Sequence, residues 1–295
     1  MKIGHLIHTS TKPFFSLEFF PPANADDLPA FYDVVAELQA LKPLFASVTY
    51  GAGGARQANT LAVTAELVRR GLETMAHLTC VGADQDNIAA FLESLAQVGV
   101  NNVLALRGDP PRDNSWEWKD GAFQHASDLV RFVRQVAPQM GIGVAAYPTP
   151  HPQSRTIAED LFFTAQKLRA GAHFAITQLF FDVREYVALV DDLHSKAVRV
   201  PVIPGIMPIR SLASLRRMME LSDTYIPGRL YLDLEEADRK GGAKAVGEVG
   251  VRFAIKQIGQ LLEAGAPGVH LYTLNKADLC QQVIRESGLL GQKDF

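Results

Sequence analysis

Residues 15–22 read FSLEFFPP, and this stretch decides how the fold begins. Alternation along a strand places Phe15, Leu17 and Phe19 on one face and puts Glu18 on the other. The two prolines that end the stretch cannot donate hydrogen bonds to a sheet, so the strand stops before them. Glu18 is therefore expected near the C-terminal end of the first strand.

The setting of Glu18 suggests a chemical role. A carboxylate among apolar neighbours is poorly solvated, so the sequence predicts a raised pKa for Glu18. A raised pKa lets a carboxyl keep its proton near neutral pH, as a general acid requires. From this stretch alone, a structural Glu18 paired with a Lys or Arg carries equal weight.

Composition excludes several classes of protein. The 295 residues are 47% hydrophobic and 21% charged, which is typical of a globular protein. A net charge of −3 and the absence of a long basic run argue against a nucleic-acid partner. No apolar stretch long enough to span a membrane and no signal-peptide pattern occur. Cys80 and Cys280 form no CxxC pair, so we expect a reducing, cytoplasmic location without a disulfide or zinc site.

The hydrophobic pattern predicts eight strands, each followed by a helix. Strands are expected over residues 14–20, 45–50, 74–80, 102–106, 143–147, 174–180, 202–206 and 268–274. Helices are expected over residues 26–41, 59–70, 86–98, 124–137, 156–170, 183–196, 211–221 and 277–287, with an inserted helical segment before the last strand. Several strands are continuous apolar runs, as in parallel strands covered on both faces. We therefore expect an α/β fold, a single (β/α)8 TIM barrel over residues 1–295. An open doubly wound sheet is less favoured because no GxGxxG follows the first strand.

Polar residues gather where the predicted strands end, which is where such barrels carry their chemistry. These residues are Glu18, Thr49, Tyr50, His77, Thr79, Arg107, Asp109, Tyr147, His151, Gln178, Tyr272 and Thr273. His77 alone is more often a core histidine, and Arg107 with Asp109 could form an ion pair inside a turn. No spacing among them is typical of metal ligands, so no metal is expected. One acid, one basic group, aromatic rings and amides suit a large, flat ligand with a polar rim.

The strand ends also carry a family resemblance. The motifs, in order, are residues 15–22 (FSLEFFPP), 48–52 (VTYGA), 77–80 (HLTC), 106–109 (LRGD), 145–148 (AAYP), 175–178 (AITQ), 181–183 (FDV), 203–206 (IPGI) and 272–275 (YTLN). With them the chain resembles the 5,10-methylenetetrahydrofolate reductases over about residues 14–285. The resemblance implies the same barrel, FAD as cofactor, NADH or NADPH as co-substrate, and reduction of 5,10-methylenetetrahydrofolate to 5-methyltetrahydrofolate.

The resemblance also assigns roles to residues. Glu18 would protonate N10 of the folate and open its five-membered ring, and hydride from FAD would then reach the methylene carbon. Asp109 would contact both flavin and pterin, Gln178 would bond the pterin and the nicotinamide, and Thr49 would touch the nicotinamide nucleotide. Arg107 and Lys167 would hold the pyrophosphate, because fixed cations suit phosphate oxygens. The residues that would hold FAD are Tyr50, Ala52, His77, Arg107, Gly108, Asp109, Ala126, Tyr147, His151, Asp160 and Lys167.

Five positions depart from the family's bacterial pattern. Lys276 stands where an Arg is usual, and Ser214 stands where a Gln contacts the folate; both are still predicted to bind substrate. Met218 replaces an aromatic residue beside the p-aminobenzoate, and Phe163 and Gln166 replace polar and basic contacts to FAD. These changes affect the predicted ends of both ligands and leave Glu18, Asp109 and Gln178 in place.

Further expectations concern assembly and alternatives. The resemblance implies a homo-oligomer and no regulatory domain, so inhibition by S-adenosylmethionine is not expected. One alternative is a flavin-independent lyase or aldolase, which would need a Schiff-base lysine or a metal cluster at a strand end. Another is a folate- or flavin-binding protein without activity, for which a costly buried acid would have no use.

Overall fold

The computed structural model describes residues 2–50, 54–81, 83–108, 123–151, 153–222 and 224–290, apart from the side chains of residues 54–58 and 221. Its strands are β1 Phe14–Phe19, β2 Ala46–Val48, β3 Thr74–Thr79, β4 Asn102–Leu106, β5 Gly141–Ala146, β6 Phe174–Thr177, β7 Val202–Ile203, β8 Gly205–Ile206 and β9 Gly268–Tyr272. All the pairings between them are parallel, in the order β7-β6-β5-β4-β3-β2-β1-β9-β8.

The sheet closes on itself through a single residue. Its two outer members, β7 and β8, are separated only by Pro204, and the N–H of His270 in β9 donates to the Pro204 carbonyl at 2.9 Å. The strand predicted over residues 202–206 is thus split in two, because proline has no N–H to donate to a ladder. β7 and β8 together occupy the place of one strand, so the nine strands form a barrel of eight. This confirms the predicted (β/α)8 barrel.

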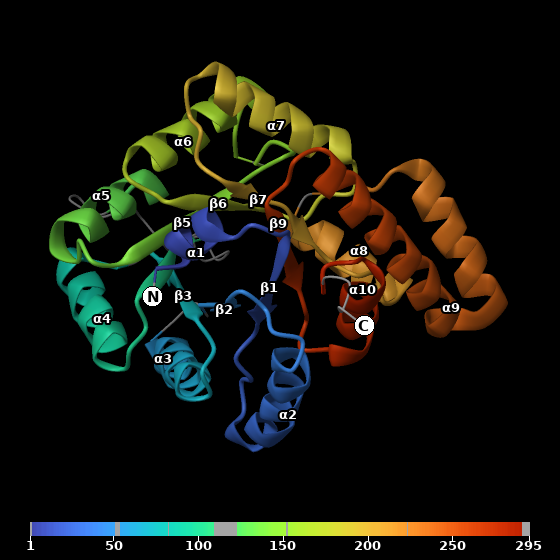
Figure 1. Ribbon diagram of the computed structural model, residues 1–295, viewed down its shortest axis with the longest axis horizontal. Coiled ribbons are helices and arrows are strands. Elements are labelled where there is room, and N and C mark those ends of the chain that lie inside the picture. Colours follow the sequence, from blue (N-terminus) through green and yellow to red (C-terminus); the bar gives the residue numbers. More distant parts are fainter. Residues whose placement is uncertain are drawn as a thin grey trace.

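Helices surround the strands, as Figure 1 shows. They are α1 Ile3–Thr9, α2 Leu28–Gln39, α3 Gly54–Arg69, α4 Gln85–Gln97, α5 Ala126–Val136, α6 Ile157–Arg169, α7 Val183–Ser195, α8 Leu212–Ser222, α9 Gly228–Glu263 and α10 Ala277–Glu286, with a 3-10 turn at Ala25–Asp27. The predicted inserted segment is α9. It bends at Gly241 and Gly242, where Gly242 has φ +60°, a conformation that side chains disfavour.

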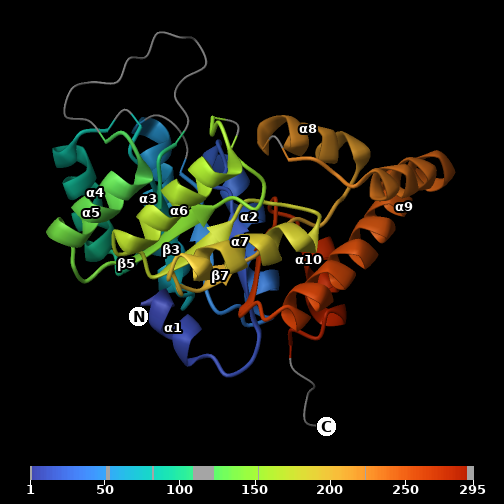
Figure 2. The same ribbon diagram turned by 90° about the horizontal axis from the view of Figure 1, so that it is seen from above.

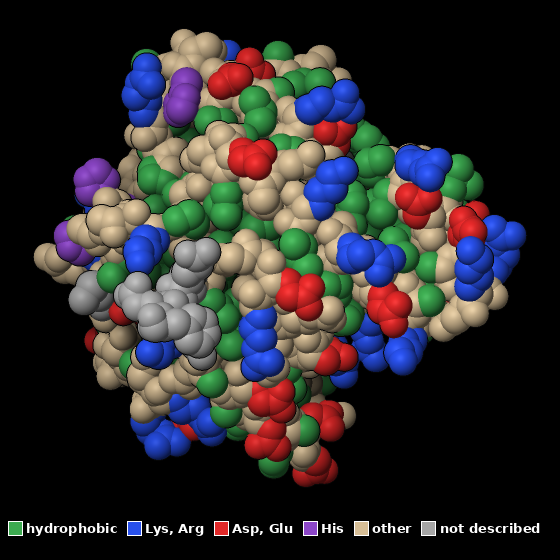
Figure 3. All heavy atoms as spheres, turned by 45° about the vertical axis from the view of Figure 1, so that its right-hand side comes forward, with side chains coloured by type: hydrophobic (Ala, Val, Ile, Leu, Met, Phe, Trp, Pro, Cys, Tyr) green, Lys and Arg blue, Asp and Glu red, His purple; other side chains and the backbone are tan. Residues whose placement is uncertain are grey.

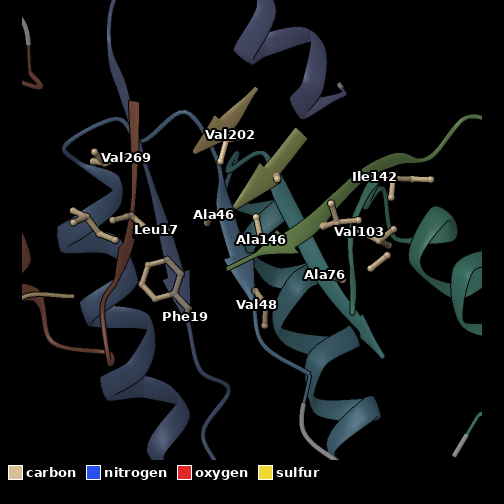
Figure 4. Close-up of a cluster of buried hydrophobic side chains, with 14 of the residues drawn as sticks. Leu17, Phe19, Ala46, Val48, Ala76, Val103, Ile142, Ala146, Val202 and Val269 are labelled. Atoms are coloured by element: carbon tan, nitrogen blue, oxygen red, sulfur yellow. The ribbon is translucent and has the colours of Figure 1, made fainter. Parts of the chain in front are cut away.

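The main core lies between the strands and this ring of helices. It takes alternate residues of each strand, such as Phe15, Leu17 and Phe19 of β1, all at most 3% exposed. Figure 4 shows Leu17 and Phe19 beside side chains of the neighbouring strands that belong to the same core. The face of β1 predicted to be apolar therefore points outward, which leaves the Glu18 face inside the barrel.

The opposite strand positions fill the barrel interior at its N-terminal end. We call this set the apolar layer: Phe14, Phe45, Met75, Leu104, Phe174, Ile176 and Ile203. Ile3 and Ile7 of α1 pack on it from below, and Figure 2 shows α1 at the edge opposite to α8. Asn102 holds α1 against the barrel, since its Oδ1 accepts the N–H of Ile3 at 2.8 Å. Apolar side chains thus fill the N-terminal end of the barrel interior, and the polar side chains inside the barrel lie toward its C-terminal end.

Several strands end earlier than predicted, and the differences after β6 and after β9 shape that end. After β6, the side-chain Oε1 of Gln178 accepts the N–H of Leu179 at 2.8 Å, which diverts the backbone from the ladder. After β9, Leu274 and Asn275 adopt φ of 48° and 54°, so the chain turns sharply. The Thr273 hydroxyl donates to the carbonyl of Glu18 at 2.6 Å and ties this turn to β1.

Candidate active site

Glu18 lies inside the barrel, one residue before the C-terminal end of β1. It pairs with Ser47 of β2 on one side and with Tyr272 of β9 on the other. The residue is only 6% exposed. The predicted position of Glu18 is confirmed, and an ionisable group at this depth requires partners.

The partners of Glu18 are two histidines and a serine. Nε2 of His77 lies 3.2 Å from Oε2 of Glu18, and Nε2 of His270 lies 3.6 Å from the same oxygen. The Ser47 hydroxyl donates to that oxygen at 3.4 Å. We call Ser16, Glu18, Ser47, His77 and His270 the polar layer; all five are at most 7% exposed.

These partners overturn the predicted pKa. Burial raises the pKa of Glu18, but His77 and His270 together lower it by more, and the result is a pKa of about 2. The expectation of a raised pKa was therefore wrong. The apolar neighbours visible in the sequence pack on the other face of β1, and the groups that face Glu18 come from β2, β3 and β9. In this arrangement Glu18 is a carboxylate.

Sequence reasoning missed His270, which is fully buried. Its Nδ1 lies 2.8 Å from the hydroxyl of Ser16, and its ring stacks on Phe45 with centroids 5.9 Å apart. A signal was available, because alternation in the last strand puts His270 on the same face as Tyr272. Tyr272 donates from its hydroxyl to the Thr177 carbonyl at 2.6 Å, and burial raises its pKa well above the usual range.

A second group of predicted residues lines one cavity of about 430 Å³. The predicted residues that the structure brings together there are Arg107, Gly108, Ala126, Tyr147, His151, Asp160 and Lys167. Lys167 is 9% exposed and donates to the Ala145 carbonyl at 2.6 Å. Burial lowers the pKa of Lys167 to about 8, while Asp160 acts in the opposite direction.

This cavity suits the predicted dinucleotide. Arg107 and Lys167 supply two cations, and a diphosphate is the part of FAD that such a pair would hold. Gly108 has φ +81°, and a Cβ there would meet Thr79 at 3.1 Å, so the backbone approaches its neighbours closely at the cavity wall. Phe163, one of the departures from the family pattern, stacks on His125 with ring centroids 4.9 Å apart. These two rings form an aromatic part of the cavity wall.

Several predicted site residues belong neither to the polar layer nor to the lining of this cavity. Thr49 accepts a hydrogen bond from Thr60 on its carbonyl, and Tyr50 packs edge-on against Phe91. Gln178 follows β6 and bonds its neighbour as described above. Asp109 and Ala52 lie outside the described residues.

The predicted contacts to the folate tail are on separate helices. Ser214 lies in the first turn of α8, where its N–H donates to the Ser211 hydroxyl at 3.1 Å. Met218 packs into a satellite core between α8 and α9. Lys276 is exposed at the start of α10. The structure does not bring Ser214 and Lys276 into contact with Glu18.

The described residues include neither a cluster of metal ligands nor a helix that could span a membrane. Within them, no three His, Cys, Asp or Glu side chains gather as metal ligands would. None of the helices in the described part of the chain has the length and apolar character needed to cross a membrane.

Comparison with known proteins gives a consistent result. Residues 2–288 match the family model for methylenetetrahydrofolate reductase. The 5,10-methylenetetrahydrofolate reductase of Salmonella typhimurium is 33% identical over 93% of this chain and 90% of its own length. Methylenetetrahydrofolate reductase (NADH) 1 of Arabidopsis thaliana is 34% identical over 94% of this chain and 49% of its own length.

Length and structure complete the comparison. The chain spans about half the length of its yeast and plant relatives, 46% to 49%. A Clostridium thermocellum protein, described as binding two copies of 5-methyl-5,6,7,8-tetrahydrofolic acid, superposes with a TM-score of 0.65 over 98% of this chain and 99% of its own. At 13% identity that likeness concerns the fold alone. The family model over nearly the whole length, together with the Salmonella relative, shows that this chain belongs to the methylenetetrahydrofolate reductase family.

Proposed function

We propose that this chain reduces 5,10-methylenetetrahydrofolate to 5-methyltetrahydrofolate, with Glu18 as the general acid and a nicotinamide nucleotide as the source of electrons. The observation that carries the proposal is the enclosed carboxylate of Glu18 at the C-terminal end of the barrel, with two histidines within 3.6 Å. Membership of the family supplies the substrate class.

FAD is the cofactor that we propose for the cavity lined by Arg107 and Lys167. Bound FAD would supply hydride-transfer chemistry between the nicotinamide and the folate. Arg107 and Lys167 would hold its diphosphate. The ring of Tyr147 lies against Lys167, with Nζ 5.4 Å from the ring centre. Asp109 and Gln178 are proposed to orient the folate ring, and Ser214 and Lys276 to bind its tail.

Glu18 acts on the folate through one proton. Opening the five-membered ring requires a proton on the departing nitrogen, and a carboxyl group is a suitable donor. In the free protein Glu18 is ionised, with a pKa of about 2, so the proton it delivers must first come from a neighbour. His77 and His270 are the neighbours that can carry one.

The test separates the two half-reactions in the FAD-loaded protein. Under anaerobic conditions, NADH or NADPH should bleach the flavin absorbance of wild type and Glu18→Gln alike. Reoxidation by methylenetetrahydrofolate should be slower in Glu18→Gln by roughly 10²- to 10⁴-fold, the usual range for a general acid. Glu93→Gln, an exposed carboxylate on α4, is the matched control and should behave as wild type.

Two results would contradict the proposal. If the protein stays colourless after incubation with FAD, it does not bind the proposed cofactor, and the flavin-independent lyase becomes the favoured alternative. Equal reoxidation rates in wild type and Glu18→Gln would remove the acid role while leaving the reductase intact.

A further inference from the structure

Each ring nitrogen of His270 faces a serine hydroxyl. Nδ1 lies 2.8 Å from the hydroxyl of Ser16, which also lies 3.3 Å from the Val269 carbonyl. When the Ser16 hydrogen points to that carbonyl, its oxygen accepts from Nδ1–H, so Ser16 can satisfy a ring that carries hydrogen on Nδ1. The other nitrogen, Nε2, faces Ser47 at 3.3 Å and Glu18 at 3.6 Å.

Ser47 stands between two groups that can exchange a proton. Its hydroxyl lies 3.4 Å from Oε2 of Glu18 and 3.3 Å from Nε2 of His270. With His270 protonated and Glu18 ionised, Ser47 accepts from Nε2–H and donates to the carboxylate. With the proton moved, Ser47 accepts from the carboxyl of Glu18 and donates to the bare Nε2. A hydroxyl satisfies both arrangements by reversing its single hydrogen.

We propose that Ser47 and His270 form a proton relay to Glu18, in which His270 stores the proton that Glu18 delivers. The Nε2 proton of His270 moves to Oγ of Ser47 while the Ser47 proton moves to Oε2 of Glu18. The O–H bond formed on Glu18 then breaks toward the substrate nitrogen, which leaves Glu18 ionised again. His270 is left neutral with its hydrogen on Nδ1, still bonded to Ser16. Neither relay residue touches the substrate, and both act through Glu18. The identity of that substrate rests on the function proposed above.

Other titratable groups facing Glu18 are less suited to this role. Tyr272 of β9 donates to the Thr177 carbonyl and is held neutral by burial. Nε2 of His77 lies 3.2 Å from Oε2 of Glu18, a direct contact that orients one of its two ring nitrogens. His270, by contrast, is oriented at both nitrogens by Ser16 and Ser47. Ser47 and His270 are both 0% exposed, so between turnovers the proton that refills His270 enters from solvent through Glu18, which is 6% exposed, and Ser47.

The first test observes the relay in the free protein, independently of any activity. Nitrogen-15 NMR of histidine-labelled protein at neutral pH should show hydrogen on both nitrogens of the His270 ring in wild type. In Glu18→Gln, which removes the anion, the ring should carry hydrogen on Nδ1 alone. A wild-type ring with Nδ1 bare, or with Nε2 bare, would overturn the relay.

The second test asks whether the relay serves the folate half-reaction. Ser47→Ala should slow flavin reoxidation by methylenetetrahydrofolate at least about tenfold, a fraction of the full general-acid effect. It should also change the pH profile of that step, and Ser47→Thr, which keeps a hydroxyl, should restore both. Thr64→Val removes a buried hydroxyl on α3 that donates only within its own helix, so it should match wild type.

The outcomes separate failure of the relay from failure of the reductase function. If Ser47→Ala and wild type reoxidise equally fast while Glu18→Gln is slow, the relay is wrong and the reductase stands. If wild type reduces no folate, the function is wrong, and the NMR result still decides whether Glu18 and His270 share a proton.

Discussion

The barrel interior has an apolar layer at its N-terminal end and a polar layer at its C-terminal end, and both layers use the same strands. β1 gives Phe14 to the first and Ser16 and Glu18 to the second. Phe14 needs only neighbours of suitable shape. The polar side chains need partners at defined distances, because an unpaired buried polar group is costly. One layer therefore depends on volume, and the other depends on orientation and charge.

The largest expected effect comes from a hole in the apolar layer. Phe174→Ala removes a fully buried ring that meets Phe45, with centroids 6.1 Å apart, and should lower the free energy of unfolding by about 3–5 kcal/mol. Phe162→Ala, on α6 and 51% exposed, is the control and should change it little. Urea denaturation measures both. Similar losses in the two variants would mean that the apolar layer is not a packed core.

Acid should weaken the polar layer selectively. The pKa of Glu18 is about 2 in the folded protein against an ordinary 4.5, so its contribution is present above about pH 4.5 and is lost as the pH falls toward 2. The difference in unfolding free energy between wild type and Glu18→Gln should shrink by on the order of 3 kcal/mol over that window. Urea denaturation at a series of pH values checks it. Ile176→Val, in the apolar layer, should show a difference that does not depend on pH; a constant difference for Glu18→Gln as well would refute its lowered pKa.

A smaller effect is expected at the edge of the polar layer. A Cβ on Gly205 would lie 2.7 Å from the ring of Tyr272 and would also meet the carbonyl of Thr177. Gly205→Ala should therefore cost about 1–3 kcal/mol through overpacking. Gly228→Ala, where nothing lies within 4 Å of the added Cβ, is the control. Thermal denaturation compares the two, and equal melting temperatures would show that Tyr272 can move aside.

The smallest effect is expected outside both layers. Nζ of Lys240 lies 2.6 Å from Glu236 on α9, with the two side chains 73% and 54% exposed. Figure 3 shows charged side chains of both signs mixed over one face of the molecule, where solvent screens them. Lys240→Ala should cost about 0.3–0.5 kcal/mol, as for an exposed helical pair. A double-mutant cycle with Glu236→Ala measures the coupling; a value above about 1 kcal/mol would contradict this view.

Much of the fold follows from local patterns in the sequence. Alternation in residues 15–22 correctly separated the helix-facing side of β1 from the side that carries Glu18. Strand ends were less predictable. Pro204 splits one strand because it has no N–H to donate, and the side chain of Gln178 ends another by accepting the N–H of its own neighbour, Leu179. A hydrophobic pattern does not register such effects of single residues.

The site was predicted in part. The cavity that joins Arg107 to Lys167 brings together residues chosen from separate motifs. The polar layer was not foreseen as a unit, because Ser47 and His270 lie 29 and 252 positions away from Glu18. Their proximity arises only when β1 lies between β2 and β9.

The sequence alone determined the eight strand–helix units, the inward side of β1 and the presence of one carboxylate at its end, because these depend on periodicity and on proline chemistry within a few residues. Tertiary structure decided the charge of that carboxylate. Burial and opposite charges act on a pKa in opposite directions, and which one prevails depends on side chains that only the closed barrel places within 3.6 Å of Glu18.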